Sequence, residues 1–294
     1  MNFRDLEYVV SVARHCHFGK AARECHVSQS ALSLQVQKLE RELGIQIFER
    51  TNRRVIVTET GQELVLKAVE ILRGRQEMLE TIQTSGEELT GNFRIGAIPT
   101  IAPYLFTEVG GGLQKHYPGI IPLFEEEVTQ GLLASVIAGE IELGIIATTP
   151  EDTLLETVDL FEEPFFLAVP RGHELVNKKV VGTEDLGGGQ MLILKDTHCL
   201  REQVLGFCHS HNVDSNRRSA ATNIATLLVL VQLEGGISMV PAMATGRESQ
   251  HPEVRFLPMD PTPTRKVRLV YRRTSRMGQR IAQAVKKCIS PRPL

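Results

Sequence analysis

Apolar residues between positions 1 and 61 recur every three or four residues, which is the spacing of amphipathic helices. A first stripe begins at Phe3, and a second runs from Phe18 to Cys25. After a tight turn, Ser28 is placed to cap a third helix that ends at Gly44. A short helix, a tight turn and a longer helix with a polar outer face predict a helix-turn-helix.

The next stretch, IFERTNRRVIVTETG, holds two short strand-like runs around Thr51–Arg54, which predict a wing. From Gln62 to about Ser85 there is no proline, and the apolar residues fall near a heptad register. This pattern predicts one long helix that pairs two copies of the chain. We therefore expect two N-terminal parts, a winged helix-turn-helix DNA-binding domain at 1–61 and a linker helix with its hinge at 62–91.

Beyond residue 92, apolar strand-like runs such as RIGAIP, LGIIAT and GISMVP alternate with helical patterns. Alternation of this kind predicts an α/β fold with mostly parallel sheets. A change in pattern near Glu163-Pro164 predicts two lobes. A ligand or sensing site would lie between them, near the C-terminal ends of strands. The expected lobes are 92–163 with 267–294, and 164–266.

The composition is that of an ordinary globular protein, with 42% hydrophobic and 23% charged residues in 294. No apolar run approaches the ~20 residues that a membrane-spanning helix needs. The start, MNFRDLEY, is charged where a secretory signal is apolar. We therefore expect a cytoplasmic protein with no membrane segment, whose thiols are normally reduced.

Charge alone gives no indication of nucleic acid, because the net charge is only -2. The DNA-binding prediction depends instead on where polar residues lie. The third helix would offer five side chains to the major groove of double-stranded DNA, namely Gln29, Ser30, Ser33, Gln35 and Lys38. The wing would add Arg50, Arg53 and Arg54 as phosphate or minor-groove contacts, unless it is simply a solvated basic loop. Pairing through the long helix would give a pseudo-palindromic operator.

The five cysteines include two pairs with the same spacing, Cys16 with Cys25 and Cys199 with Cys208. The first pair has neighbouring histidines, which would suit a metal. Zinc sites more often show CxxC-like pairs, however, and free cysteine is among the most buried residues. We therefore expect core packing for this pair and no metal site. Cys288 is expected on a helix face.

The second pair falls after the apolar run MLIL and the short loop KDTH, which places Cys199 near the start of a helix. The helix dipole there favours the thiolate and lowers the pKa of the thiol. Cys208 lies towards the far end of the same helix and is expected to be buried. Nine helical residues span ~13.5 Å, whereas a disulfide needs Cα atoms about 4.4–6.8 Å apart. A disulfide therefore requires the helix to unravel, which Gly206 would make easier.

The run FGKAARECHVSQSALSLQVQKLERELGIQIFER, followed by TETG, resembles the LysR-type transcriptional regulators. The long helix and the α/β remainder fit the same family, so the resemblance covers the whole chain. It implies two lobes like those of periplasmic binding proteins, assembly as a dimer of dimers, and contact with RNA polymerase. In this sequence Ser30-Ala31 stands where the family often has Pro-Thr.

The segments RIGAIPTIAPYL, EVTQGLLA, GHEL and HCLREQVLGFC resemble the peroxide-sensing members of that family. This resemblance implies an activator that responds to oxidative stress through a reversible Cys199–Cys208 disulfide, without a cofactor. Hydrogen peroxide would be held by Thr100, Thr129 and His198, with Arg265 near the thiol. Glu202 stands where those members usually have aspartate.

Other interpretations stay open on the sequence. The two threonines could be simple helix caps. The two cysteines could be packed thiols in a regulator that binds a small metabolite or anion between its lobes, without a redox switch. A thiol peroxidase is a third interpretation, but the DNA-binding pattern argues against an enzyme, and residues 92–294 hold no nucleotide loop, metal motif or serine triad.

Overall fold

The computed structural model describes residues 1–50, 55–83, 89–186, 191–195, 199–211, 220–246 and 251–290. The chain divides into two compact units, Met1–Ser85 and Gly86–Leu294, and each is described by itself. None of the described helices is both long and apolar enough to cross a bilayer.

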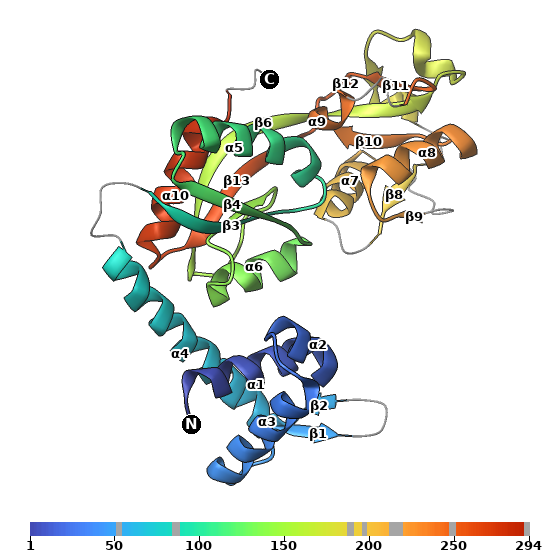
Figure 1. Cartoon of the computed structure of the whole chain (residues 1–294). Helices are drawn as coiled ribbons and strands as arrows, with labels where there is room; N and C mark the ends of the chain where they lie inside the picture. The colour runs from blue at the N-terminus through green and yellow to red at the C-terminus, as the bar shows by residue number, and fades with distance from the viewer. Residues whose placement is uncertain are drawn as a thin grey trace. The chain divides into compact units, whose positions relative to one another are not determined.

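The N-terminal unit is a winged helix-turn-helix followed by a long helix, as the sequence predicts (Figure 1). Asn2 and Ser28 cap the first and third helices. The turn after the second helix contains His26 with a φ of 54°. The elements are α1 (Phe3–His15), α2 (Phe18–Glu24), α3 (Gln29–Leu43), β1 (Phe48–Arg50), β2 (Val55–Val57) and α4 (Glu59–Gln83). Strands β1 and β2 pair antiparallel and form the wing.

The long helix begins earlier than the sequence predicts, at Glu59 instead of Gln62. The Thr58 hydroxyl accepts a hydrogen bond from the backbone N–H of Gly61 at 2.9 Å, which stabilises the first turn. A Cβ on Gly61 would lie 2.3 Å from the carbonyl oxygen of Ile47, so only glycine allows this close approach. Glu59, Thr60 and Gly61, which follow the second predicted strand of the wing, therefore belong to the helix.

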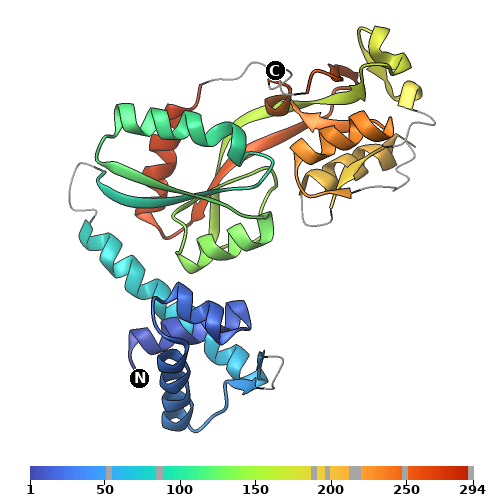
Figure 2. The same ribbon diagram turned by 45° about the vertical axis from the view of Figure 1, so that its right-hand side comes forward.

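The C-terminal unit contains two hydrophobic cores joined by crossing strands. The first core is built by β3 (Gly91–Ala97), α5 (Ala102–His116), β4 (Ile120–Glu126), α6 (Thr129–Ala138), β5 (Leu143–Ile146) and α10 (Arg276–Cys288). Figures 1 and 2 show α5 and α10 side by side on one face of the sheet, with α6 on the opposite face. This arrangement confirms the predicted α/β fold.

The second core is smaller and is built from shorter elements. They are two 3-10 turns (Glu174–Asn177 and Thr183–Leu186), β7 (Val181–Gly182), β8 (Ile193–Leu194), α7 (Cys199–Ser210), β9 (Ala220–Ala221), α8 (Ile224–Glu234), β10 (Ser238–Pro241), α9 (Ala242–Thr245), β11 (Val254–Leu257) and β12 (Met259–Asp260).

Two long strands, β6 (Leu155–Pro170) and β13 (Thr264–Arg272), connect the cores. They pair antiparallel with each other, and the second half of β6 continues antiparallel against β10 and β11. The sheet order is β10-β6-β13-β5-β3-β4. Only its β4, β3 and β5 portion is parallel, so the expectation of mostly parallel sheets is wrong for the crossing strands. The lobe bounds given above stay predictions.

Three consecutive glycines lie within α5, and the packing explains two of them. A Cβ on Gly112 would lie 2.4 Å from the Cβ of Cys288 on α10. A Cβ on Gly110 would lie 3.3 Å from the ring of Phe124, whereas one on Gly111 would meet nothing within 4 Å. The helix therefore needs a glycine at position 112 and gains nothing from one at 111.

We predict opposite effects for the substitutions Gly112→Ala and Gly111→Ala. Gly112→Ala overpacks the α5–α10 contact and lowers the free energy of unfolding by about 1–3 kcal/mol. Gly111→Ala removes a flexible residue from a helix and raises it by about 0.5–1 kcal/mol. Urea unfolding followed by circular dichroism measures both, and equal effects of the two variants would contradict the packing argument.

Candidate inter-lobe thiol site and DNA-binding helix

The helix α7 carries both cysteines of the second pair. Cys199 is its first residue and Cys208 lies two residues before its end. Cys208 is fully buried in the second core, whereas Cys199 is partly buried and packs against the first core. Both are free thiols. The helical rise separates them by ~13.5 Å along the axis, on opposite sides of the helix. The two thiols are therefore embedded in different cores.

Arg265 on β13 is the charged residue of the site, and it is completely buried. Its guanidinium donates to the Thr100 hydroxyl at 3.0 Å and to the Thr100 carbonyl oxygen at 3.1 Å. Its Nε–H donates to the Glu163 carboxylate at 2.8 Å. The side chains of Arg265 and Glu163 are 0% and 2% exposed, so this ion pair is removed from solvent screening.

Thr100 therefore has a role other than capping. The N-cap of α5 is Ile101, and no side chain caps that helix. Thr100 is 1% exposed, and its hydroxyl and carbonyl oxygens both receive hydrogen bonds from Arg265. The capping interpretation is wrong for this residue, because its hydroxyl bonds a side chain 165 positions away.

Thr129 is likewise not a cap, since Val128 occupies that position without a side-chain hydrogen bond. The Thr129 hydroxyl lies near the Cys199 thiol and can donate to the thiolate, which lowers the pKa of Cys199. Its buried oxygen has no hydrogen-bond partner among the described residues. Buried hydroxyls are normally satisfied, so its capacity for a further hydrogen bond marks a place for a small polar ligand.

The pKa of the Cys199 thiol is raised, not lowered as the sequence predicts. Burial raises the pKa, and this effect outweighs the hydrogen bond from Thr129, the positive charge of Arg265 and the backbone N–H groups at the start of α7, which all lower it. The prediction considered the helix dipole but could not include the desolvation that the opposing lobe causes. Cys199 is therefore held largely as the neutral thiol at neutral pH.

Gln203 belongs to the site, although the sequence analysis did not select it. It lies four residues after Cys199, so both face the same side of α7. Its amide nitrogen donates to the carbonyl oxygen of Ala147, just beyond β5, at 2.8 Å. Its amide oxygen is buried without a hydrogen-bond partner among the described residues. The spacing from Cys199 was the signal that could have identified it.

One predicted ligand residue, His198, lies outside the described residues, so the structure neither places it nor assigns it a contact. The described site thus brings together Cys199, Thr129, Arg265 and Thr100, and it separates Cys208 from them. The pKa of the Cys208 thiol is raised by burial alone.

The polar face of α3 presents part of the predicted DNA-reading set. Gln29, Ser30 and Lys38 are exposed, and Ser33 is partly buried. Gln35 differs from the expectation, because its amide donates to the carboxylate of Asp5 at 2.7 Å and so ties α3 to α1. Arg50 ends β1, and its side chain, like the whole of Arg53 and Arg54, lies outside the described residues.

The residues around the first cysteine pair make contacts within the N-terminal unit. No group of three or more histidine, cysteine or acidic side chains is placed to hold an ion among the described residues. His17 instead caps α2 by accepting from two backbone N–H groups. Cys25 is partly buried against the core of the N-terminal unit. Cys16 is exposed in a left-handed turn, so the expectation of core packing is wrong for Cys16.

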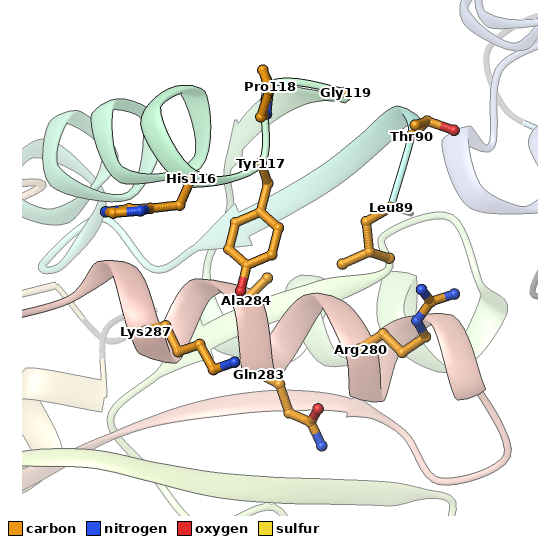
Figure 3. Close-up of a pocket in the computed structure, with 10 residues that line it drawn as sticks. All are labelled: Leu89, Thr90, His116, Tyr117, Pro118, Gly119, Arg280, Gln283, Ala284 and Lys287. Atoms are coloured by element: carbon orange, nitrogen blue, oxygen red, sulfur yellow. The ribbon is translucent and has the colours of Figure 1, made fainter. Parts of the chain in front are cut away.

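A separate cavity of about 400 Å³ lies where the start of β3, the end of α5 and the outer face of α10 meet. Figure 3 shows the ring of Tyr117 at its centre, above Ala284 and beside Lys287. None of the predicted sensing residues lines it. The cavity is therefore distinct from the thiol site.

The family of this chain follows from sequence comparison. Residues 3–62 match the bacterial regulatory helix-turn-helix protein, lysR family, and residues 86–289 match the LysR substrate binding domain. Together these matches cover most of the chain. The chain therefore belongs to the LysR family of transcriptional regulators.

Individual relatives point to one branch of the family. The chain is 39% identical over 284 residues to the DNA-binding transcriptional dual regulator OxyR of Escherichia coli K12, covering 96% of this chain and 93% of that protein. A full-length OxyR cysteine variant from Pseudomonas aeruginosa is 31% identical, with a TM-score of 0.77 over 98% of this chain and 94% of that one. A hydrogen peroxide-bound OxyR cysteine mutant from Corynebacterium glutamicum is 28% identical, with a TM-score of 0.66 over 98% and 92%.

We predict that Thr129→Val shifts the pH dependence of Cys199 alkylation to higher pH. The substitution removes the hydroxyl that stabilises the thiolate, so the already raised pKa of Cys199 rises further. Thr129→Ser keeps the hydroxyl and is expected to retain the wild-type profile. Iodoacetamide labelling of Cys199, quantified by mass spectrometry across pH, measures the shift. A profile that does not respond to loss of the hydroxyl would contradict the assigned contact.

Proposed function

We propose that this chain is a DNA-binding transcriptional activator that senses hydrogen peroxide by oxidation of Cys199 and formation of a Cys199–Cys208 disulfide. The observation that carries the proposal is the placement of two free thiols on one helix, each in a different core. The OxyR relatives support it, because one of them is a hydrogen peroxide-bound structure. Others carry the name hydrogen peroxide-inducible genes activator.

The first chemical step takes place at Cys199. The thiolate sulfur attacks one peroxide oxygen, the O–O bond breaks, and the leaving hydroxide takes a proton to become water, which leaves a sulfenic acid. The Thr129 hydroxyl can bond the peroxide, and the charge of Arg265 can stabilise negative charge on the sulfur and on the departing oxygen. The resemblance to the OxyR relatives assigns His198, immediately before Cys199, to the same site.

The second step requires a change of structure. The Cys208 thiol attacks the sulfenic sulfur, an S–S bond forms, and water leaves. This step is impossible while α7 is intact, since ~13.5 Å of helix separates the residues and a disulfide allows no more than about 6.8 Å between Cα atoms. Unwinding of α7 removes Cys208 from the second core and breaks the Gln203–Ala147 hydrogen bond. The oxidised regulatory domain therefore packs differently from the reduced one.

The DNA-binding and assembly parts of the proposal depend on exposed surfaces of the first unit. The exposed polar face of α3 would enter the major groove, where Gln29 can read a base and Lys38 can contact a phosphate. Helix α4 exposes Leu66, Ile71 and Met78, which are 67%, 44% and 58% accessible. Exposed apolar residues on a long helix suit pairing with a second copy. We propose a homodimer on a pseudo-palindromic operator, and two such dimers in a tetramer.

We also propose that the protein works in the cytoplasm, in contact with RNA polymerase, and that it is a regulator and not an enzyme. The alternative of a metabolite or anion bound between the lobes, without redox switching, is less well supported. The cation best placed to receive an anion, Arg265, is already paired with Glu163. A neutral ligand such as hydrogen peroxide does not need an unpaired charge.

We predict that brief treatment with one equivalent of hydrogen peroxide removes two titratable thiols from the wild-type protein. Neither Cys199→Ser nor Cys208→Ser loses two thiols, because each variant lacks one cysteine of the disulfide. The half-buried Cys288 lies on α10 in the first core, so Cys288→Ser serves as the matched control and still loses two thiols. Thiol counting with a chromogenic disulfide measures the loss. Slow and unselective loss in every variant would contradict the switch and favour the metabolite interpretation.

We predict that Lys38→Ala weakens operator binding. It also makes the negative slope of log affinity against log salt shallower by about 1, since one phosphate contact is lost. Lys67→Ala is the matched control, because Lys67 is an exposed lysine on α4 that pairs with Glu70. Fluorescence anisotropy with labelled operator DNA at several salt concentrations measures both variants. An equal loss in the two variants would show that α3 has no special role.

A further inference from the structure

The buried ion pair between Glu163 and Arg265 joins the two crossing strands directly. The two residues are cross-strand neighbours, Glu163 on β6 and Arg265 on β13. The second carboxylate oxygen of Glu163 accepts from the backbone N–H of Met243, on α9, at 2.6 Å. Glu163 therefore links Arg265, which acts on the Cys199 thiol, with the backbone of α9.

Thr100 and Phe165 also contact the guanidinium of Arg265. Two bonds to Thr100 fix its terminal nitrogens, and its carbon lies 5.9 Å from the centre of the Phe165 ring. These contacts do not involve Glu163. Removing the carboxylate would therefore change the charge at this place more than it would change the position of the guanidinium.

We propose that Glu163 is a positioning residue that limits the reactivity of Cys199 by counterbalancing the charge of Arg265. The inference rests on the proposed function, for which the reactivity of Cys199 matters. A lone cation in a buried site stabilises a nearby thiolate strongly, whereas a paired cation acts as a dipole whose field falls off faster. The pair thus keeps the thiol mostly protonated, and it raises the peroxide level to which the sensor responds.

The direction of the Cys199 pKa agrees with this role of Glu163. The pKa of Cys199 is raised by burial even though Arg265 acts on it. Among the described residues of α7, Arg201 does not provide the same control. Arg201 on the same helix is 8% exposed and is paired with the exposed Glu202 at 3.3 Å. The pairing of Arg265 is therefore the place where a single substitution can alter the charge presented to Cys199.

The test compares Glu163→Gln with Glu162→Gln in the full-length protein. Glu162 is the partly exposed neighbour on β6, and its carboxylate accepts from the Thr264 hydroxyl and not from Arg265. We expect Glu163→Gln to move the pH profile of Cys199 alkylation by iodoacetamide to lower pH. Its alkylation at pH 7 should rise on the order of threefold, because a larger thiolate fraction is partly offset by the weaker nucleophilicity of a lower-pKa thiolate. Glu162→Gln should leave the profile unchanged.

Glu163→Asp separates charge from packing, since it restores the carboxylate with a shorter side chain. We expect its profile to lie closer to wild type than that of Glu163→Gln. A role in folding alone would lower the thermal midpoint in both variants without moving either profile. An unchanged profile, or a shift to higher pH, in folded Glu163→Gln would overturn the proposal.

If Glu163→Gln does not fold, a double variant tests whether Glu163 opposes the charge of Arg265. Glu163→Met with Arg265→Met replaces the buried pair with apolar residues of similar size, an exchange that is often neutral for stability. Because Arg265 lowers the pKa of Cys199 even when it is paired, we expect the profile to move to higher pH, but by less than in Arg265→Met alone, where the Glu163 carboxylate stays. An equal shift in the two variants would show that Glu163 does not oppose Arg265, and the proposal would fail.

Alkylation needs no peroxide, so these results are independent of the proposed function. Disulfide formation with hydrogen peroxide is measured in parallel on the same variants. A profile that shifts as expected while no variant forms a disulfide would retain the role of Glu163 and reject peroxide sensing. The opposite result, normal disulfide formation in every variant with no shift, would retain peroxide sensing and reject this role.

Discussion

The rigidity of α7 is the constraint on which the site depends. An intact helix keeps Cys199 against the first core and Cys208 inside the second, and its rise leaves them too far apart to bond. Any chemistry that joins the two sulfurs must therefore unwind α7 and remove at least one of the two cysteines from its packing. The connection between a covalent bond and the shape of the regulatory unit follows from this geometry, without a separate transmitting element.

Two opposing effects set the pKa of the Cys199 thiol. Burial favours the neutral form of Cys199, while Thr129 and Arg265 favour the thiolate. Arg265 is itself bonded to Glu163 on the neighbouring crossing strand and to Thr100 just before α5. A small polar ligand can complete the hydrogen bonding of Thr129. These contacts support the proposal that the ligand is a small neutral oxidant.

Much of the architecture follows from local pattern. The caps at Asn2 and Ser28, the turn before α3 and the position of α7 are short-range features, since each depends on residues within one or two helical turns. The same local reasoning was wrong for Cys16, which is exposed at a left-handed helix end. It also could not predict that Gln35 would be bound by Asp5, because that contact joins residues 30 positions apart.

By itself the sequence determined the class of protein, the presence of a thiol at a helix start, and the ~13.5 Å of helix between Cys199 and Cys208. These depend on helical period and on motifs within a few residues. Only the tertiary structure decided the direction of the Cys199 pKa, the pairing of Arg265 with Glu163, and the contact of Gln203 with Ala147. The reason is physical: desolvation and buried charge depend on groups brought together from opposite lobes, and no local pattern records which groups will meet.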